Sequence, residues 1–313
     1  ALPDSLAYIG ASAFSSCNQL RSITLPAGVK TIGDYAFLGC FGLTSIVIPE
    51  SVTSIGNEAF SSCINLSSIT IPSGVNSIGD LAFAGCYNLT SAFIPQSVTS
   101  IGDAPFSHCR YITSIIVEDS NTIYDSQNGC NAIIATSTNT LIQGCSTTII
   151  PEGVTSIGNH AFSGCNSLTS IKLPESVTSI GIEAFYNCNL TSITIPKRVT
   201  AIEQYAFYGC NNITSITSKA SVPPRCDGTS FGSVNKSIPV YVPESSIAVY
   251  QAENAWNEFT NILPYYDNTL SIEDIETLAG SQIVLSVNLD NVVDITNFQF
   301  DLVLPEGLTL AQG

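Results

Sequence analysis

The cysteines are the residues of this chain with the most obvious chemical potential, because thiols can bridge, bind metal or act as nucleophiles. Eleven are present, together with two histidines, His108 and His160. Equivalent positions of a repeat project in parallel, whereas a disulfide needs converging Cβ vectors, and no C-x2-C pair offers zinc spacing. We therefore predict a column of buried thiols rather than disulfides or a metal site. Eight cysteines form this column, each fourteen residues after a proline: Cys17, Cys40, Cys63, Cys86, Cys109, Cys165, Cys188 and Cys210.

Two further groups could support catalysis. His108 directly precedes Cys109, as in a nucleophilic cysteine–histidine pair, but a thiol on an apolar column ionises poorly. Glu118, Asp119 and Asp125 form an acidic cluster that could act as acid and base or hold calcium, although a solvated loop is the simpler interpretation. We predict that the chain is not an enzyme and has no catalytic residue, metal or cofactor.

A repeat of 23 residues positions these side chains, and its unit reads L-T-S-I-x-I-P-x-x-V-x-x-I-G-x-x-A-F-x-x-C-x-N. In one unit, alternation predicts a strand over 66–71, and a second inward segment follows over 75–78. Gly79 would turn the chain, and the Ala82-Phe83 pair suits a single helical or 3₁₀ turn. The asparagines that precede the strands suit a left-handed corner: Asn65, Asn88, Asn189 and Asn212.

One such coil cannot bury its own apolar face, but parallel coils stacked about 4.8 Å apart bury Leu, Ile, Phe and Cys against their neighbours. The predicted fold class is a β-rich solenoid, a curved right-handed coil of about ten turns with short parallel strands and 3₁₀ or helical turns. We expect its strand side to be concave.

The columns resemble those of the BspA-like family of leucine-rich repeats, in which I-P, I-G, A-F and Cys recur every 23 residues. Ile71-Pro72, Ile78-Gly79, Ala82-Phe83 and Cys86 show the motif, and the resemblance covers residues 1–266. It implies a leucine-rich-repeat coil on a bacterial cell surface, with a role in adhesion or recognition and a partner that differs between members.

The repeat is interrupted once, after Ile116, where Glu118 takes the place of a proline. An irregular hairpin insert is predicted at about 118–150, in which the segment from Asn131 to Gln143 forms a β-hairpin across a Ser-Thr-Asn turn. Cys130 and Cys145 would face each other there, either as a disulfide or as two buried thiols.

The solenoid is predicted to occupy residues 1–218 and a C-terminal cap residues 219–266. The cap would contain a strand at 239–242 and one helix from Ser246 to Asn257, capped by Ser245. Residues 267–313 alternate like the opening strands of an immunoglobulin-like or cohesin-like β-sandwich, so we expect a partial β-sandwich segment, a truncated module, there.

The formal net charge is −16 and the pI about 4.2, which disfavours nucleic acid and anionic membranes as partners. No apolar run approaches the ~20 residues that cross a bilayer. The chain begins inside a repeat without Met, so we expect a mature or trimmed fragment of a secreted or cell-surface protein, without its export signal. We expect a monomer.

The outward strand positions form two rows across the coils. One row is nearly all Ser or Thr, and the other turns apolar in three successive coils and then basic. Because apolar residues exposed on a rigid concave surface often mark an interaction site, we predict that this stripe binds the partner. The alternatives are that β-formers simply favour strands, or that the insert buries the stripe. The predicted site comprises Ser91, Phe93, Ser114, Ile116, Thr147, Ile149 and Lys172.

These features favour a non-enzymatic extracellular recognition or adhesion protein. Its partner would be a host extracellular or cell-surface protein, or a glycan, bound through the concave solenoid face. A structural spacer that presents another module, an enzyme, and an ice-binding plane of Ser and Thr rows are the alternatives. The apolar interruption of the Ser/Thr rows argues against the ice-binding plane.

Overall fold

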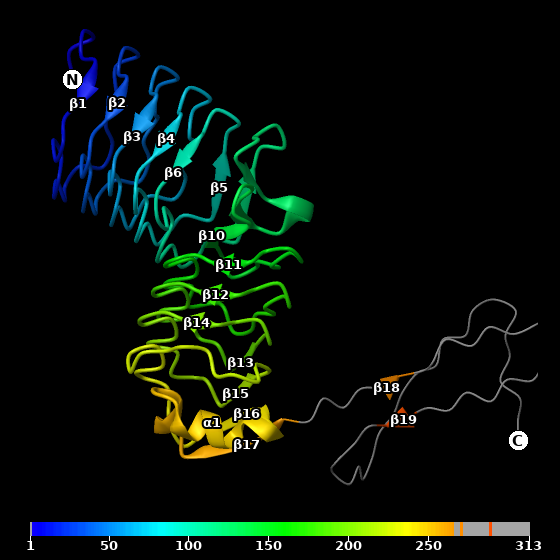
Figure 1. Cartoon of the computed structure of the whole chain (residues 1–313). Coiled ribbons are helices and arrows are strands. Elements are labelled where there is room, and N and C mark those ends of the chain that lie inside the picture. The colour runs from blue at the N-terminus through cyan, green and yellow to red at the C-terminus, as the bar shows by residue number, and fades with distance from the viewer. Residues whose placement is uncertain (1, 266–269, 272–287, 290–313) are drawn as a thin grey trace, which may run out of the picture. The chain divides into compact units, whose positions relative to one another are not determined.

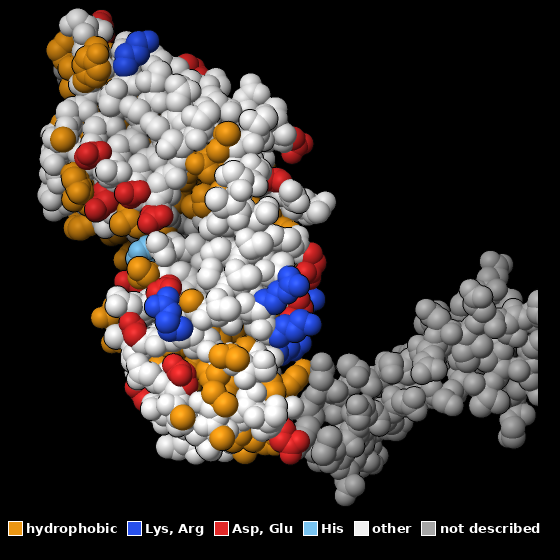
Figure 2. Space-filling model, in the orientation of Figure 1, with side chains coloured by type: hydrophobic (Ala, Val, Ile, Leu, Met, Phe, Trp, Pro, Cys, Tyr) orange, Lys and Arg blue, Asp and Glu red, His pale blue; other side chains and the backbone are white. Residues whose placement is uncertain are grey.

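The computed structural model describes residues 2–265, 270–271 and 288–289. The chain up to Pro264 forms one compact unit, a parallel-strand β-solenoid of about eleven turns with few helices (Figure 1). The predicted fold class is confirmed. The structure has about one turn more than the ten that were predicted. This turn lies beyond residue 219, where the sequence columns were expected to stop. Most of the surface in Figure 2 carries neither charge nor apolar side chains.

One row of short strands follows the Ile-Gly motif, and we call it the I-G row. Its strands pair in parallel, with Ile32 opposite Ile55 and Ile55 opposite Ile78, so residues one repeat apart lie side by side. The strands of this row before and after the insert are β1 (Tyr8–Ile9), β2 (Thr31–Ile32), β3 (Ser54–Ile55), β4 (Ser77–Ile78), β6 (Ser100–Ile101), β11 (Ser156–Ile157), β12 (Ser179–Ile180) and β14 (Ala201–Ile202).

The second row precedes the Ile-Pro motif, and we call its outer surface the I-P face. Inward residues such as Ile94 and Ile195 are fully buried, while their neighbours Phe93 and Thr194 are exposed, as a period of two requires. The strands of this row are β5 (Ser91–Ile94) with β7 (Ser114–Val117), then β13 (Ser192–Ile195), β15 (Ser215–Ser218), β16 (Pro239–Pro243) and β17 (Asn261–Tyr265).

A series of turns around the Ala-Phe motif, the A-F turn, closes each coil. Ala36 N–H bonds within the turn to Gly33 O (3.2 Å), whereas Phe37 N–H donates to Ala59 O of the next coil (2.7 Å). Intervening residues such as Tyr35 have left-handed backbone (φ 58°). The three-residue spacing of the internal bonds is that of a 3₁₀ helix, but they are not consecutive. The expected helical turn is therefore a set of non-helical turns that tie successive coils together.

Two local expectations need correction. Gly79 is required by close packing between coils, because a Cβ there would lie 2.5 Å from Asn57 N. The left-handed residue of each corner immediately precedes the cysteine, as at Gly85 (φ 69°), and is not the following asparagine. Asn65 instead donates its side-chain amide to Phe41 O of the previous coil (2.7 Å).

The core is a stack of equivalent side chains. Phe37, Phe60 and Phe83 lie with ring centroids 5.1 and 5.5 Å apart and nearly parallel planes. Six of the column thiols donate to the carbonyl of a phenylalanine in the previous coil, as Cys63 does to Phe37 O (3.2 Å), whereas Cys165 after the insert points to Gly144 O (4.0 Å). Cys17 is exposed because no described coil precedes it. The other column cysteines are buried and free: Cys40, Cys63, Cys86, Cys109, Cys165, Cys188 and Cys210.

The insert forms the predicted hairpin, in which β9 (Ala132–Ala135) runs antiparallel to β10 (Thr140–Gly144). β8 (Tyr124–Asp125) and the 3₁₀ turn η1 (Gln127–Gly129) precede it. β10 also pairs with β11, with Leu141 opposite Ile157, so the hairpin fills one place in the I-G row. Cys130 and Cys145 are both buried free thiols in the structure.

The A-F turn of the inserted coil is shortened. Cys145 follows Leu141 by only four positions, whereas Cys86 follows Ile78 by eight. The coils on either side therefore meet directly, with His108 N–H donating to Ser163 O (2.8 Å). Because the strand rows keep their extra coil and the A-F side does not, the stack bends toward the A-F turns at the insert (Figure 1).

Gln143 fills the gap that this shortening leaves. In a regular coil Phe83 N–H donates to the backbone of the next coil, at Pro105 O (2.8 Å). Phe106 N–H has no such carbonyl and donates to Gln143 Oε1 (3.1 Å), while Gln143 Nε2 donates to Gly144 O (2.9 Å) and Ala161 O (3.1 Å). The buried side-chain amide thus stands in for a peptide group between the two halves of the solenoid.

The cap continues the stack and then closes it. Phe231 stacks on Phe207 (5.2 Å, 2°), which extends the phenylalanine column past the predicted boundary, and the buried Trp256 covers it. The predicted helix is shorter than expected, since the backbone turns extended at Glu253, directly after Ala252. Ser245 is not its cap, because Ser246 holds that position. The helical elements of the cap are η2 (Glu244–Ser246), α1 (Ile247–Ala252) and η3 (Trp256–Glu258).

A second unit begins at Tyr265. Within it the structure describes Tyr265 and the antiparallel pair β18 (Leu270–Ser271) and β19 (Asn288–Leu289). The remainder of the predicted immunoglobulin-like or cohesin-like segment lies outside the described residues. Among the described helices, none combines the length and apolar character needed to cross a membrane.

Candidate interaction surface

The cysteine–histidine pair does not have nucleophilic geometry. The Cys109 thiol donates to Phe83 O (3.2 Å), and burial raises its pKa to about 12. His108 Nδ1 lies 2.9 Å from Ser107 Oγ, and burial, followed by the Arg110 charge, lowers the His108 pKa. The thiol is buried and protonated, and the imidazole is hydrogen-bonded to another residue. The pair therefore provides no activated nucleophile.

The acidic cluster is part of the coil edge. Glu118 Oε2 accepts a hydrogen bond from Gln96 N–H (2.7 Å), which fixes this carboxylate against the neighbouring coil. Asp119 is exposed and Asp125 belongs to β8. Nowhere in residues 2–265 do three or more His, Cys, Asp or Glu side chains gather as a metal site would require.

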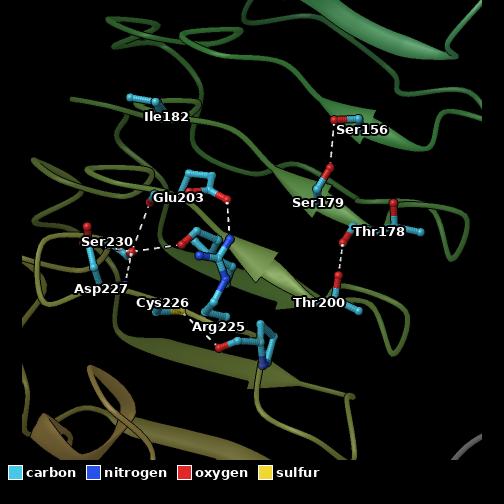
Figure 3. A network of polar contacts seen from close by, with 12 residues as sticks. Ser156, Thr178, Ser179, Ile182, Thr200, Glu203, Arg225, Cys226, Asp227 and Ser230 are labelled. Atoms are coloured by element: carbon cyan, nitrogen blue, oxygen red, sulfur yellow. Dashed lines mark hydrogen bonds and ion pairs between the residues drawn. The ribbon is translucent and has the colours of Figure 1, made fainter.

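A polar network joins the last coils to the cap (Figure 3). Ser230 Oγ donates to Ile202 O and Glu203 O (3.0 Å each), and Arg225 pairs with Glu203 (3.1 Å). These contacts occupy the groups that could otherwise act on a ligand, so the network is a structural joint that anchors the cap.

Thiol accessibility tests the cysteine column directly. We expect a thiol reagent at about pH 8 to label Cys17 rapidly, because it is exposed, and the ten buried thiols only after unfolding, since the packed core excludes the reagent. Counting the fast-reacting thiols by absorbance gives one in the native protein and eleven in denaturant. Rapid labelling of several column thiols in the native state would contradict the packing described above.

The I-P face carries an exposed apolar pair. β5 and β7 place Phe93 directly opposite Ile116, and the two side chains are 49% and 48% exposed. The insert therefore does not bury them, which removes one of the alternatives for this stripe. Ser91 and Ser114 pair beside them on the same strands. The structure brings these four predicted residues together.

Of the other predicted residues, Ile149 and Lys172 lie apart from this pair, whereas Thr147 stays beside β7. Ile149 is exposed, but its N–H donates to Cys130 O in the insert (3.1 Å), so its backbone partner is the insert and not β7. Thr147 reaches the preceding coil through its hydroxyl, which donates to Thr113 O (2.6 Å). Lys172 is exposed one coil further on. The insert thus separates Ile149 and Lys172 from the apolar pair, while Thr147 remains in contact with the coil of β7.

The expected concavity of the strand side is wrong at this point. The bend at the insert turns toward the A-F turns, so β5, the strand that carries Phe93, lies on its outer side (Figure 1). β7, which carries Ile116, pairs with β5 there. The sequence could not show this, because the direction of the bend depends on which side of the inserted coil is shortened. The predicted stripe is therefore a raised surface and not the floor of a groove.

Sequence reasoning also passed over an aromatic group on the A-F side. Tyr186 and Tyr208 stack in adjacent coils (5.6 Å, 9°), Tyr205 meets Tyr208 edge-on, and His108 approaches Tyr186 across the bend. The signal was available, because Tyr follows the Phe of both coils. The stacked rings present their edges to solvent, since their faces cover each other.

The comparisons with known proteins agree with this architecture. The family model described as BspA type leucine rich repeat region (6 copies) matches residues 1–130 and 139–245, well over half of the chain. The chain belongs to the BspA-type leucine-rich-repeat family. The gap in the match, 131–138, falls on the hairpin of the insert, so the departure from the family pattern is the segment that bends this BspA-type solenoid. No curated protein matches the chain.

Several solved bacterial structures are similar. A leucine-rich cell surface protein from Faecalibacterium prausnitzii is 30% identical, with a TM-score of 0.63 over 83% of this chain and 77% of that one. A leucine-rich repeat protein from Bacteroides ovatus is 27% identical, with a TM-score of 0.58 over 83% of this chain. The match spans only 64% of the length of the Bacteroides ovatus protein. The pneumococcal vaccine antigen PcpA, at 21% identity and a TM-score of 0.58, shares the fold.

Proposed function

We propose that this chain is an exported, non-enzymatic recognition protein of a bacterial cell surface, which binds a host extracellular or cell-surface protein through its I-P face. The exposed Phe93–Ile116 pair carries the proposal. Its backbone is fixed by pairing between two coils, so it can bury apolar area on binding without first becoming ordered.

The surroundings of the pair support this role. Large apolar side chains that are half exposed on a rigid surface are typical anchors of an interface, and the hydroxyl rows beside them can form a polar rim. The description of the Faecalibacterium prausnitzii relative as a cell surface protein agrees with export. Bacterial leucine-rich-repeat families are generally recognition proteins rather than enzymes.

The test combines a screen with a double substitution. The full chain is screened against an array of purified extracellular-matrix and cell-surface proteins, and every hit is measured again with F93A/I116S. We expect the variant to bind at least about 30-fold more weakly, roughly 2 kcal/mol, because both anchors are lost. Its melting temperature should stay close to that of the parent.

The matched control is V222S/V249S, which removes two exposed apolar side chains from the cap. It should bind as the parent does. Equal affinity of F93A/I116S and the parent for every hit would reject the pair as the binding site. If the array gives no hit at all, the chain is better described as a spacer that presents another module.

A further inference from the structure

The basic residues of this acidic chain are unevenly distributed. Four of its nine Lys and Arg residues lie between positions 172 and 219, in the coils that follow the insert. Figure 2 shows two groups of Lys and Arg side chains in the lower half of the solenoid, one of them at its right edge. The four residues, which we call the basic edge, are Lys172, Lys197, Arg198 and Lys219.

The coil register brings the basic edge together. β13 and β15 pair Ile195 with Ser218, and Lys219 N–H donates to Ile195 O (3.0 Å), so Lys219 lies beside Pro196, next to Lys197. The Lys219 ammonium reaches two coils back to Glu175 Oε1 (3.2 Å), which spans the position of Lys197. Three successive coils therefore each present a cation at the Pro edge of the I-P face.

Acidic side chains offset the basic edge only in part. Glu175 pairs with Lys219, and Glu152 lies near Lys172 across a shallow surface hollow. The other carboxylates of this stretch, Glu183 and Glu203, form ion pairs elsewhere with His160 and Arg225. Lys172, Lys197 and Arg198 are exposed. Cations about 4.8 Å apart along the axis form a line that an extended polyanion could follow.

The side chains around the basic edge indicate which class of polyanion it would bind. The outward residues between the cations are hydroxylic, namely Ser192, Thr194, Ser215 and Thr217, and they offer hydrogen bonds to a hydroxylated chain. A protein interface would need an apolar centre here, and nucleic acid would need aromatic rings on which bases can stack. The outward positions of β13 and β15 carry neither, and a single aromatic residue, Tyr241 of β16, flanks them beside Thr217.

We propose that the basic edge binds an anionic polysaccharide, sulfated or carboxylated, that lies along the solenoid axis. This inference rests on the proposed function only in assuming that the I-P face is the binding face. The ligand class and the residues are different from those of the Phe93–Ile116 pair, so one molecule could engage a protein and a polysaccharide on the same face.

Fluorescent heparin fragments, titrated against the full chain, provide the test. We expect saturable binding that weakens about 15- to 60-fold between about 50 and 200 mM salt, because two or three counterions are released per complex. K172S/K197S/R198S should lose about 100-fold in affinity, at roughly fivefold for each cation. Neutral dextran should not bind, and F93A/I116S should bind heparin as the parent does.

The control R21S/K30S/R110S removes the same charge from other parts of the solenoid. Its affinity for heparin should fall by no more than about threefold, because these charges act on the ligand only through the long-range electrostatic field. Equal losses in the two triple variants, absence of heparin binding by the parent at low salt, or equally tight binding of single-stranded DNA would each overturn the proposal. These results would leave the array test of the Phe93–Ile116 pair unaffected, so the two proposals fail independently.

Discussion

Replacing Phe60 by alanine should lower the free energy of unfolding by about 3–5 kcal/mol. The Phe60 ring is fully buried between Phe37 and Phe83, with centroids 5.1 and 5.5 Å away and planes within 5°. The substitution removes the ring's transfer free energy and its contacts with two coils, and the hydrogen-bonded turns on both sides limit collapse into the cavity. Urea unfolding followed by circular dichroism measures the effect.

The same substitution at Phe93 is the control, because that ring is half exposed. F93A should change the free energy of unfolding by less than about 1 kcal/mol. The two variants thus compare the same Phe-to-Ala substitution at a buried position of the column and at an exposed position of the outward row. A loss below about 1 kcal/mol for F60A, or an equal loss for F93A, would mean that the columns do not stack as described.

Replacing Gln143 by leucine should cost about 2–4 kcal/mol, although the volume of the side chain changes little. Gln143 is fully buried and makes three hydrogen bonds to backbone groups. Leucine leaves Phe106 N–H without an acceptor and removes one donor each from Gly144 O and Ala161 O. Ala161 O keeps the Gly144 N–H as a donor (2.8 Å), so the main cost comes from Phe106 N–H, since a buried group that loses its partner costs more than the average hydrogen bond contributes.

The loss of the Gln143 hydrogen bonds should also allow the two halves of the solenoid to unfold independently. The buried core divides into two clusters that meet at the insert, and Gln143 connects the coils on either side. In a repeat protein a weakened junction favours independent unfolding of the segments that it joined. We therefore expect Q143L to unfold in two steps in urea. Q19L, at an exposed glutamine, should unfold like the parent; a single unshifted transition for Q143L would contradict the assigned role.

Much of this architecture could be predicted from the sequence, because a strict period of 23 fixes which residues are neighbours. Phe60 and Phe83 do stack, and Phe93 and Ile116 do face outward in register. These positions follow from side-chain periodicity alone, which is insensitive to the details of the turns.

The parts that could not be predicted depend on interactions outside the period. Gln143 lies in a hairpin that has no counterpart in the other coils, so nothing in the columns pointed to its role as a substitute peptide group. The bend follows from the short sequence separation between Leu141 and Cys145. This separation changes the path of the backbone but not the pattern of inward and outward residues. Phe231 was missed because the spacing from Phe207 is 24 residues, although its environment is that of every other ring in the column.

Site-specific crosslinking tests most directly whether the I-P face is the recognition surface. A photoreactive residue is placed at Phe93 in one variant and at Val249, equally exposed on the cap, in another, and each is irradiated with the partner selected on the array. The account predicts a covalent adduct from position 93 and none from position 249. Adducts from position 249 alone, or from neither position, would contradict it.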